Sequence, residues 1–343
     1  MSGFETIIGQ HLPIRLLQTF ISNGAVPHAL LFAGMQGIGK RTSARVFAAA
    51  LNCRNRIQPA SDHPPVSLPC AHCRSCTQIL TDHHPDVICV EPQGTLLRIE
   101  QIRQLRASLA MKPFSATHRV VIITDSHRMN AEAGNALLKV LEEPPTDTIL
   151  ILTAHQRSDL LPTIVSRCRH IPFAPLGAAD IEALLVDAQG VDPDQARTLA
   201  HISQGSLGRA IDLVNGTWQQ ERDWVIRAAG LDSPDGFSKR PLGAALAFAS
   251  QLAGRKDRVP DLLDALKTWI RDLSVCAHRP RQVTNQDLAD VLEKISRQMD
   301  PKQLLHWWKS IDKAQKDIAG NANLRLTLDL MAIQLAIYPP SNR

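Results

Sequence analysis

The sequence predicts an α/β domain, a parallel sheet with helices on both faces, followed by domains built from helices alone. Short apolar runs alternate with helical patterns over about the first 175 residues, as in sheets whose strands are joined by crossover helices. After Pro175 the strand patterns stop. All five Trp lie in the last third of the chain, and this change in composition indicates a separate C-terminal domain.

Each expected strand is a short apolar run bounded by turn residues. The expected strands are 28–33, 87–90, 119–125, 148–153 and 171–173. Apolar residues at helical spacing predict helices at 42–51, 99–109, 130–143 and 160–165, the third ended by two prolines. Further helices are expected at 180–189, 194–202, 206–214, 261–277, 285–299, 301–318 and 323–337. The Pro-rich stretch from Arg54 to Pro69 is typical of a loop.

Length and composition exclude several classes of protein. A chain of 343 residues suggests about two domains, or three. With 44% hydrophobic and 21% charged residues, a wholly disordered or fibrous chain is excluded. No secretory signal or membrane-spanning run is visible, so a cytoplasmic protein with no membrane partner is expected. A net charge of +5 is compatible with nucleic acid, but 4% aromatic residues argue against stacking on single strands.

A glycine-rich turn lies between the first expected strand and the helix after it. Gly34, Gly37, Gly39 and Lys40 have the spacing and the strand–turn–helix context of a P-loop, whose backbone N–H groups and lysine bind phosphates. A glycine turn without a ligand is the alternative, although this pattern is specific. These four residues and Asp125, at the end of a later strand, form the expected nucleotide site.

Two parts that ATP hydrolysis requires are missing from this site. The residue after the P-loop lysine is normally Ser or Thr, whose hydroxyl binds Mg²⁺, and here it is Arg41. Thr42 lies about 100° further round the helix and should point elsewhere. Asp125 should be followed by an acid that polarises the attacking water, and here the residue is Ser126. We therefore expect no independent hydrolysis, while weak ATP binding through Lys40 and the loop amides stays open.

Four of the seven cysteines are grouped, namely Cys53, Cys70, Cys73 and Cys76. An odd number of cysteines and no export signal argue against a disulfide framework. Four thiolates at this spacing satisfy tetrahedral Zn²⁺ and close its shell, so a structural zinc is expected; a reduced cluster without metal is the alternative. Nearby side chains are expected at the surface: His72, His83 and His84. The scattered cysteines are expected to be small buried residues: Cys89, Cys168 and Cys276.

The N-terminal half resembles the AAA+ subunits of bacterial sliding-clamp loaders. Besides the P-loop and the cysteine cluster, the resemblance rests on Ile8–Gln10, His28–Phe32, Leu51–Cys53, Asn135–Pro145 and Ser166–Cys168. It covers about residues 5–215 clearly and the remainder weakly, through Asn321–Leu324. The resemblance implies an AAA+ P-loop domain over 1–173 with a zinc module at 53–76, a small helical lid over 174–216 and a helical collar over 217–343.

Departures from the family pattern suggest a particular role. Motor subunits of this family carry a P-loop Thr, an Asp-Glu pair and a nucleotide-sensing Arg, where this chain has Arg41, Ser126 and Gly208. In this the chain resembles the delta-prime subunits, the stators of the DNA polymerase III clamp loader. The resemblance implies a hetero-pentamer with gamma/tau motor subunits and the delta subunit. Through that complex it implies the sliding clamp and primer-template DNA as partners, within a DNA-directed DNA polymerase (nucleotidyltransferase) holoenzyme.

Arg167 is the residue to which the resemblance gives a catalytic role. It implies that Arg167 lies at the edge of the AAA+ domain and acts in trans, as an arginine finger on the ATP of a neighbouring motor subunit. A guanidinium is always charged and matches phosphate oxygens with fixed donors. The residues alone allow a surface Arg near a helix C-terminus, where positive charge is mildly favoured. Arg169 is expected to matter less.

Two other functions are compatible with parts of the sequence. One is an active motor ATPase of the clamp loader, with Thr42 or water replacing the lost hydroxyl; nucleotide turnover by the isolated chain would identify it. The other is a zinc-dependent DNA-binding protein. Against the second, the cysteines lie inside an NTPase-like domain, and no basic recognition helix follows them.

Overall fold

The computed structural model describes residues 3–55, 69–94, 96–216, 218–233, 241–320 and 322–337, without the side chains of 257, 281 and 319. Contacts divide the chain into a first unit, Met1–Ile181 with Ser203–Arg209, and a second unit, Glu182–Ile202 with Ala210–Arg343. The expected lid, 174–216, is divided between the two units, and its boundaries stay a prediction. Most of the expected loop from Arg54 to Pro69, and Asn321 of the C-terminal motif, lie outside the described residues.

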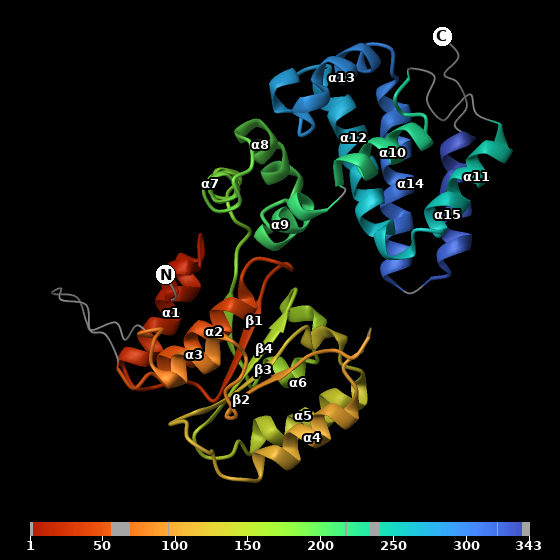
Figure 1. The fold of residues 1–343 in the computed structure, drawn as a ribbon. Coiled ribbons are helices and arrows are strands. Elements are labelled where there is room, and N and C mark those ends of the chain that lie inside the picture. Colours follow the sequence, from red (N-terminus) through yellow and green to blue (C-terminus); the bar gives the residue numbers. More distant parts are fainter. Residues whose placement is uncertain are drawn as a thin grey trace. The chain divides into compact units, whose positions relative to one another are not determined.

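The first unit is built around a parallel sheet in the order β2-β3-β4-β1-β5 (Figure 1). Its strands are β1 (Ala29–Ala33), β2 (Val87–Val90), β3 (Arg119–Ile123), β4 (Thr148–Ala154) and β5 (Arg169–Pro172). Because parallel neighbours cannot be joined by a tight hairpin, each connection crosses over the sheet. The predicted parallel sheet is confirmed.

Helices cover both faces of this sheet, as predicted (Figure 1). One face carries α1 (His11–Ser22), α2 (Lys40–Leu51) and α3 (Arg74–Leu80), and the other α4 (Ile99–Leu109), α5 (Ala131–Glu142) and α6 (Pro162–Val165). Strand side chains alternate between faces, so Leu31, Val121 and Leu150 share one core with Leu105 of α4 and Leu137 of α5.

The described secondary structure of the second unit consists of helices. Along the chain, the sheet is followed by three short helices: α7 (Ala178–Gln189), α8 (Pro193–Ile202) and α9 (Leu207–Asn215). The remaining helices are α10 (Trp218–Ala228), α11 (Leu242–Ala253), α12 (Val259–Cys276), α13 (Ala289–Ser296), α14 (Pro301–Ala319) and α15 (Leu324–Ala336). Among the helices that the structure describes, none combines the length and apolarity needed to cross a membrane.

Tryptophans anchor the core of the second unit, in agreement with the change in composition. Trp269 and Trp307 are buried, and their Nε1–H groups donate to the carbonyls of Leu231 and Leu335 at 2.9 and 3.0 Å. These bonds satisfy the only polar atom of each large apolar side chain. α12 packs against α10, α13 and α14, and α11 packs against α15.

One predicted helix of the second unit is shorter than expected. The helix predicted at 285–299 forms only a 3-10 turn at Gln286–Leu288 and then α13. The fully buried Asp272 carboxylate accepts the backbone N–H groups of Thr284 and Asn285, at 2.9 and 2.8 Å to Oδ2. Because a side chain from α12 holds this backbone in a turn, regular helix begins later than the apolar spacing predicts.

In the first unit, the buried carboxylate of Asp86 ties the segment after α4 to the start of β2. Its oxygens accept the backbone N–H groups of Phe114, Ser115 and Ala116 at 2.7, 2.8 and 2.9 Å. Burial alone would raise the pKa of Asp86, but these three donors outweigh it and hold the pKa below its usual 3.8. The ionised carboxylate therefore stabilises this connection.

We expect Asp86→Asn to lower the free energy of unfolding at neutral pH by about 1–3 kcal/mol, because an amide is a weaker acceptor than a carboxylate. The folded pKa is below the unfolded one, so the contribution of Asp86 is present above pH 3.8 and is lost as the pH falls through the folded value. Urea unfolding at about pH 7 and about pH 3 should show a difference between the two proteins that shrinks on acidification. A constant difference would contradict this explanation.

Candidate metal centre and phosphate loop

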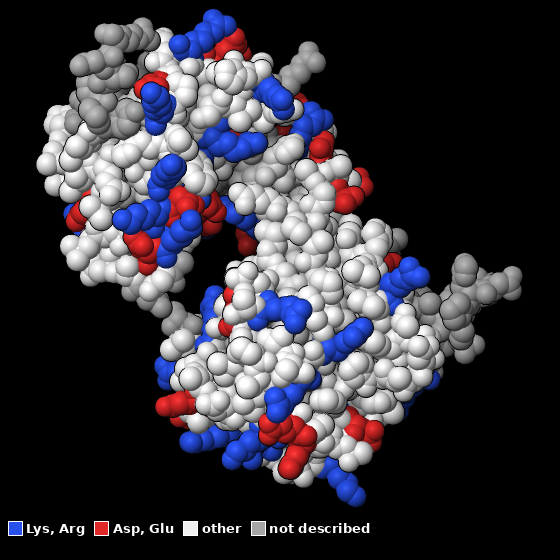
Figure 2. All heavy atoms as spheres, turned by 180° about the vertical axis from the view of Figure 1, so that it is seen from behind, with Lys and Arg blue, Asp and Glu red and all other residues white. Residues whose placement is uncertain are grey.

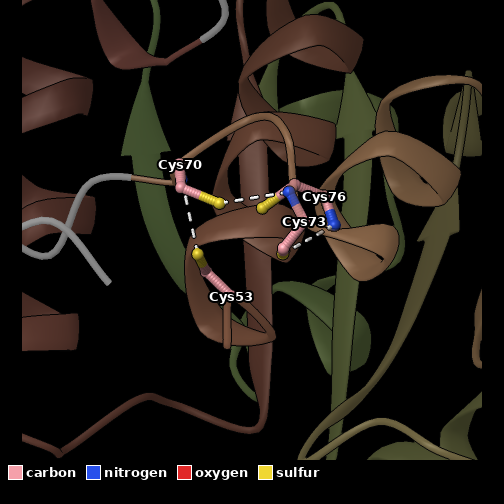
Figure 3. Close-up of side chains that lie close together, drawn as sticks. All are labelled: Cys53, Cys70, Cys73 and Cys76. Carbon is pink, nitrogen blue, oxygen red and sulfur yellow. Dashed lines mark hydrogen bonds between the residues drawn. The ribbon is translucent and has the colours of Figure 1, made fainter. Parts of the chain in front are cut away.

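The four grouped cysteines lie together between the end of α2 and the start of α3 (Figure 3). Their Sγ atoms all lie within 4.8 Å of one another, and Cys53, Cys70 and Cys76 are buried. Ala71 has a left-handed backbone, with φ of 63°, in the turn that connects Cys70 to Cys73. The structure thus brings together all four predicted ligands, including Cys53, which lies just beyond the end of α2.

Backbone N–H groups donate to three of these sulfur atoms. The N–H of Cys70 donates to Cys53 Sγ at 3.3 Å, that of Cys73 to Cys70 Sγ at 3.3 Å, and that of Cys76 to Cys73 Sγ at 3.5 Å (Figure 3). Burial would raise the pKa of the Cys73 thiol, but the N–H groups of Cys76 and Arg54 outweigh it and lower this pKa to about 6. Burial raises the pKa of Cys53 and Cys76.

This donor set fits a metal ion of tetrahedral preference. With metal–sulfur bonds of about 2.3 Å, neighbouring sulfur atoms of a tetrahedral site lie about 3.8 Å apart. The present separations, within 4.8 Å, need only small side-chain rotations to reach that value. A divalent cation would hold all four thiols as thiolates despite the burial of Cys53 and Cys76. The cluster can therefore hold a metal through sulfur alone.

The prediction that all three nearby histidines lie at the surface was wrong for His84. His72 and His83 are exposed, but His84 is buried in the turn that leads into β2. Its Nδ1 accepts the backbone N–H of Asp86 at 3.1 Å, because this turn folds against the start of the sheet. Burial lowers the pKa of His84. Among the scattered cysteines, Cys276 is buried as predicted, whereas Cys89 and Cys168 are only half-buried.

The predicted P-loop connects β1 to α2. Gly37 and Gly39 have left-handed backbones, with φ of 75° and 94°, which favour glycine. Gly39 is the N-cap of α2, so the helix begins two residues before its predicted start. Lys40 Nζ donates to the carbonyls of Gly34 and Met35 at 2.5 and 2.7 Å. Burial lowers the pKa of Lys40 to about 8, against the opposing effect of Asp125.

The start of α9 lies against the P-loop. The N–H of Gly208 donates to the Gly37 carbonyl at 2.8 Å. A Cβ atom at Gly37 would collide with the Ser206 hydroxyl, and one at Gly208 would lie 2.9 Å from Gly37 Cα. Gly208, where motor subunits of the resembled family carry a sensing Arg, thus allows close backbone contact instead. A phosphate entering this loop would compete with the bonds that Lys40 already makes.

The residues at the missing catalytic positions have other partners. Arg41 is exposed and forms ion pairs with Asp82, at 3.5 Å, and with Glu91. Ser126 is buried, and its hydroxyl donates to the Ile123 carbonyl at 3.0 Å. Neither side chain can take over the lost magnesium ligand or the lost acid. Thr42 is exposed.

Asp125 follows β3, and its backbone N–H donates to Thr153 Oγ1 of β4 at 3.0 Å. Its side chain lies with those of His127 and His155, which no pattern in the sequence indicated. These residues form no recognised motif. The sequence does show that metal-binding side chains follow the ends of two expected strands, Asp125 after β3 and His155 after β4. It does not show that these two strands are neighbours in the sheet.

Arg167 lies between α6 and β5, with 37% of its side chain exposed. Its guanidinium donates to the Thr163 carbonyl at 2.9 Å and lies 2.8 Å from the Glu142 carboxylate. β5 runs parallel to β1, and Pro172 pairs with Ala33, the residue before the P-loop. Arg167 precedes β5 and therefore lies at the amino ends of these two strands, whereas the P-loop lies at their carboxyl ends. β5 runs about 10 Å from Arg169 to Pro172 and separates the two positions.

Comparisons with known proteins follow the same division of the chain. The family model described as DNA polymerase III, delta subunit, matches residues 9–177, and the C-terminal delta subunit model matches residues 239–336. The chain is 30% identical over 323 residues to the DNA polymerase III subunit delta' of Pseudomonas aeruginosa, which covers 91% of this chain and 92% of that protein.

Two Bacillus subtilis proteins are also similar. Identity is 34% over 215 residues to DNA polymerase III subunit delta', covering 62% of each chain. It is 31% over 217 residues to DNA polymerase III subunit tau, covering 62% of this chain and 37% of tau. The match therefore spans less than two thirds of either Bacillus protein. The predicted fold class, a P-loop domain built on a parallel sheet with helices on both faces and followed by a helical part, is confirmed by the parallel sheet, the helical second unit and the family match. Since the similarity to the Pseudomonas delta' subunit extends over nearly the whole of both chains, this chain belongs to the family of DNA polymerase III delta' subunits.

Proposed function

We propose that this chain is the stator of a DNA polymerase III clamp loader, which takes part in ATP-driven loading of the sliding clamp onto primed DNA without hydrolysing ATP itself. The altered nucleotide site carries this proposal. Arg41 replaces the magnesium-binding hydroxyl and forms ion pairs with Asp82 and Glu91. Ser126 replaces the acid that polarises water, and its hydroxyl donates a hydrogen bond to the carbonyl of Ile123 in β3. A site that lacks both groups can retain the fold of an ATPase but not its chemistry.

Its proposed partners are the gamma/tau motor subunits and the delta subunit in a hetero-pentamer, with the clamp and primer-template DNA reached through the complex. Similarity to delta' and tau proteins supports this environment. In the proposed collar, 217–343, α15 exposes the apolar side chains of Leu326 and Leu330 to 67% and 48%. Such side chains on a terminal helix suit contact with another subunit. The proposed lid covers 174–216.

Arg167 is the group that such a stator would contribute to catalysis. Arg167 precedes the amino end of β5, whereas this chain's own P-loop follows the carboxyl end of the parallel strand β1. The guanidinium therefore cannot serve that loop. It is exposed, and a guanidinium has more donors than its contacts with Thr163 and Glu142 use. In the assembled loader, Arg167 would turn to the ATP of the adjacent motor subunit and stabilise charge on the transferred phosphoryl group.

The cysteine cluster is proposed to hold a structural Zn²⁺. Cys53, Cys70, Cys73 and Cys76 fill four positions, so no position is left for a reactive water. The ion would tie the end of α2 to the start of α3. A zinc-dependent DNA-binding protein is less compatible with the surface: Lys and Arg side chains are interspersed with Asp and Glu on the face that Figure 2 shows.

A phosphate-release assay on the isolated chain tests the stator against the motor. We expect no ATP turnover above background for either the unmodified chain or Lys40→Ala, because the hydroxyl that binds Mg²⁺ and the acid that orients the attacking water are both missing. Co-purification with gamma/tau and delta subunits should succeed for both. Turnover that Lys40→Ala abolishes would establish the motor instead, and failure to assemble would remove the clamp-loader role.

A further inference from the structure

Three side chains able to bind a metal meet at the carboxyl edge of the sheet. Asp125 follows β3, His127 lies in the 3-10 turn Ser126–Arg128 after it, and His155 directly follows β4. β3 and β4 are parallel neighbours, so the residues beyond their carboxyl ends lie at the same edge, where α/β proteins commonly bind ligands. The bond from the Asp125 N–H to Thr153 Oγ1 fixes one strand end against the other.

The three side chains are close enough to share one ion. One ligand atom from each lies within 4.8 Å of the other two. The imidazole rings of His127 and His155 have centroids 4.2 Å apart and planes inclined by 39°. In a tetrahedral site with nitrogen and oxygen bonds of about 2.0–2.2 Å, the ligand atoms lie about 3.3–3.6 Å apart, so modest rotations of exposed or half-buried side chains would complete the geometry.

A second observation also indicates a missing partner. The Nδ1 atom of His127 is buried and has no hydrogen-bond partner among the described residues. Buried polar atoms in folded proteins are nearly always bonded, so an unpaired ring nitrogen next to a carboxylate and a second imidazole requires an explanation. A cation at this position would give the ring a ligand to bind. Either ring nitrogen can serve, since rotation of the ring exchanges their positions.

We propose that Asp125, His127 and His155 bind a divalent transition-metal ion of the zinc class, at a site distinct from the four cysteines. Two imidazoles and one carboxylate suit Zn²⁺, Co²⁺ or Ni²⁺, whereas Mg²⁺ and Ca²⁺ prefer oxygen ligands alone. Three protein ligands leave one coordination position open, unlike the closed sulfur site. This proposal does not depend on the role of the chain in a clamp loader.

Charges around the three ligands set the expected strength of binding. The Asp159 carboxylate acts on both rings and favours a cation. Lys40 and Arg128 are also within electrostatic range of His155 and oppose a cation. With one carboxylate ligand, one nearby acid and two nearby bases, we expect weaker binding here than at the four thiolates. Metal should therefore exchange at this site while the sulfur site keeps its ion.

Titration of the full-length protein with Co²⁺ tests the proposal, in a buffer whose reductant does not bind metal. We expect one further equivalent of Co²⁺ with visible ligand-field absorption and no sulfur-to-cobalt charge-transfer band in the near ultraviolet. His127→Ala and His155→Ala should each raise the dissociation constant at least tenfold, and the double variant should not bind this equivalent. His83→Ala, an exposed histidine outside the cluster, is the matched control and should bind as the unmodified chain does.

A second measurement distinguishes this site from others. Adding Zn²⁺ should shift the imidazole ¹H–¹⁵N resonances of His127 and His155, assigned by their loss in the single variants, before those of other histidines. Far-ultraviolet circular dichroism confirms that each variant is folded. The proposal is wrong if cobalt gives only the charge-transfer band, if the extra equivalent persists in the double variant, or if Mg²⁺ displaces it at equal concentration.

Discussion

Cys73→Ser should release the metal from the cysteine cluster and lower the free energy of unfolding of the first unit by more than about 4 kcal/mol, in the range of a lost metal or disulfide. Binding to a closed zinc site contributes roughly 10–16 kcal/mol at neutral pH. Without the ion, the buried Cys53, Cys70 and Cys76 would retain only weak sulfur hydrogen bonds. Zinc content by elemental analysis and thermal unfolding would measure the two effects.

Serine at position 73 separates loss of metal from loss of helix capping. Cys73 is the N-cap of α3, and its sulfur accepts the Cys76 N–H. A serine hydroxyl is a good N-cap, so the substitution keeps this acceptor while removing the thiolate. Cys89→Ser, a half-buried cysteine of β2 outside the cluster, is the matched control and should keep both zinc and stability close to normal. Unmodified protein without stoichiometric zinc would refute the metal assignment.

Arg167→Ala should leave a reconstituted clamp loader assembled but impair hydrolysis at the motor site next to this chain. Arginine fingers contribute about 10³–10⁵ in rate, or roughly 4–7 kcal/mol of transition-state stabilisation. In the proposed complex, total turnover should fall less than this, because the other motor sites would keep their own fingers. Assembly by size-exclusion chromatography, ATPase activity with clamp and DNA, and clamp loading should be measured on the same preparation.

Two controls test whether the guanidinium itself is needed. Arg169→Ala removes another exposed arginine two residues further on, at the start of β5, and should have little effect. Arg167→Lys keeps the charge but loses the planar donors, so it should resemble Arg167→Ala if the group binds phosphate oxygens. If a loader with Arg167→Ala loads clamps at the unmodified rate, the arginine-finger assignment is wrong. Arg167 would then serve only its ion pair with Glu142 and its hydrogen bond to the Thr163 carbonyl of α6.

Local patterns determined much of the first unit. Strands β1, β3 and β4 were predictable because each is an apolar run that is buried on both faces of the sheet. β2 is also a short apolar run, although it lies at the edge of the sheet and is mostly half-buried. The P-loop was predictable because the turn itself requires left-handed glycines. Helices α1 and α3 were not predicted, and the helix expected at 285–299 was too long, because a buried carboxylate from another helix captures its first N–H groups.

The sequence by itself determined the parallel sheet, the four-cysteine group and the loss of the two catalytic residues, because each is written in neighbouring residues or in a fixed spacing. Only the tertiary structure decided which distant residues meet. The strand order places His155 beside Asp125, β5 places Arg167 at the edge of the sheet away from the P-loop, and the close approach of Gly208 to Gly37 occupies the space beside that loop. These contacts depend on the order of parallel strands and on packing between segments far apart in the chain, which local propensity does not encode.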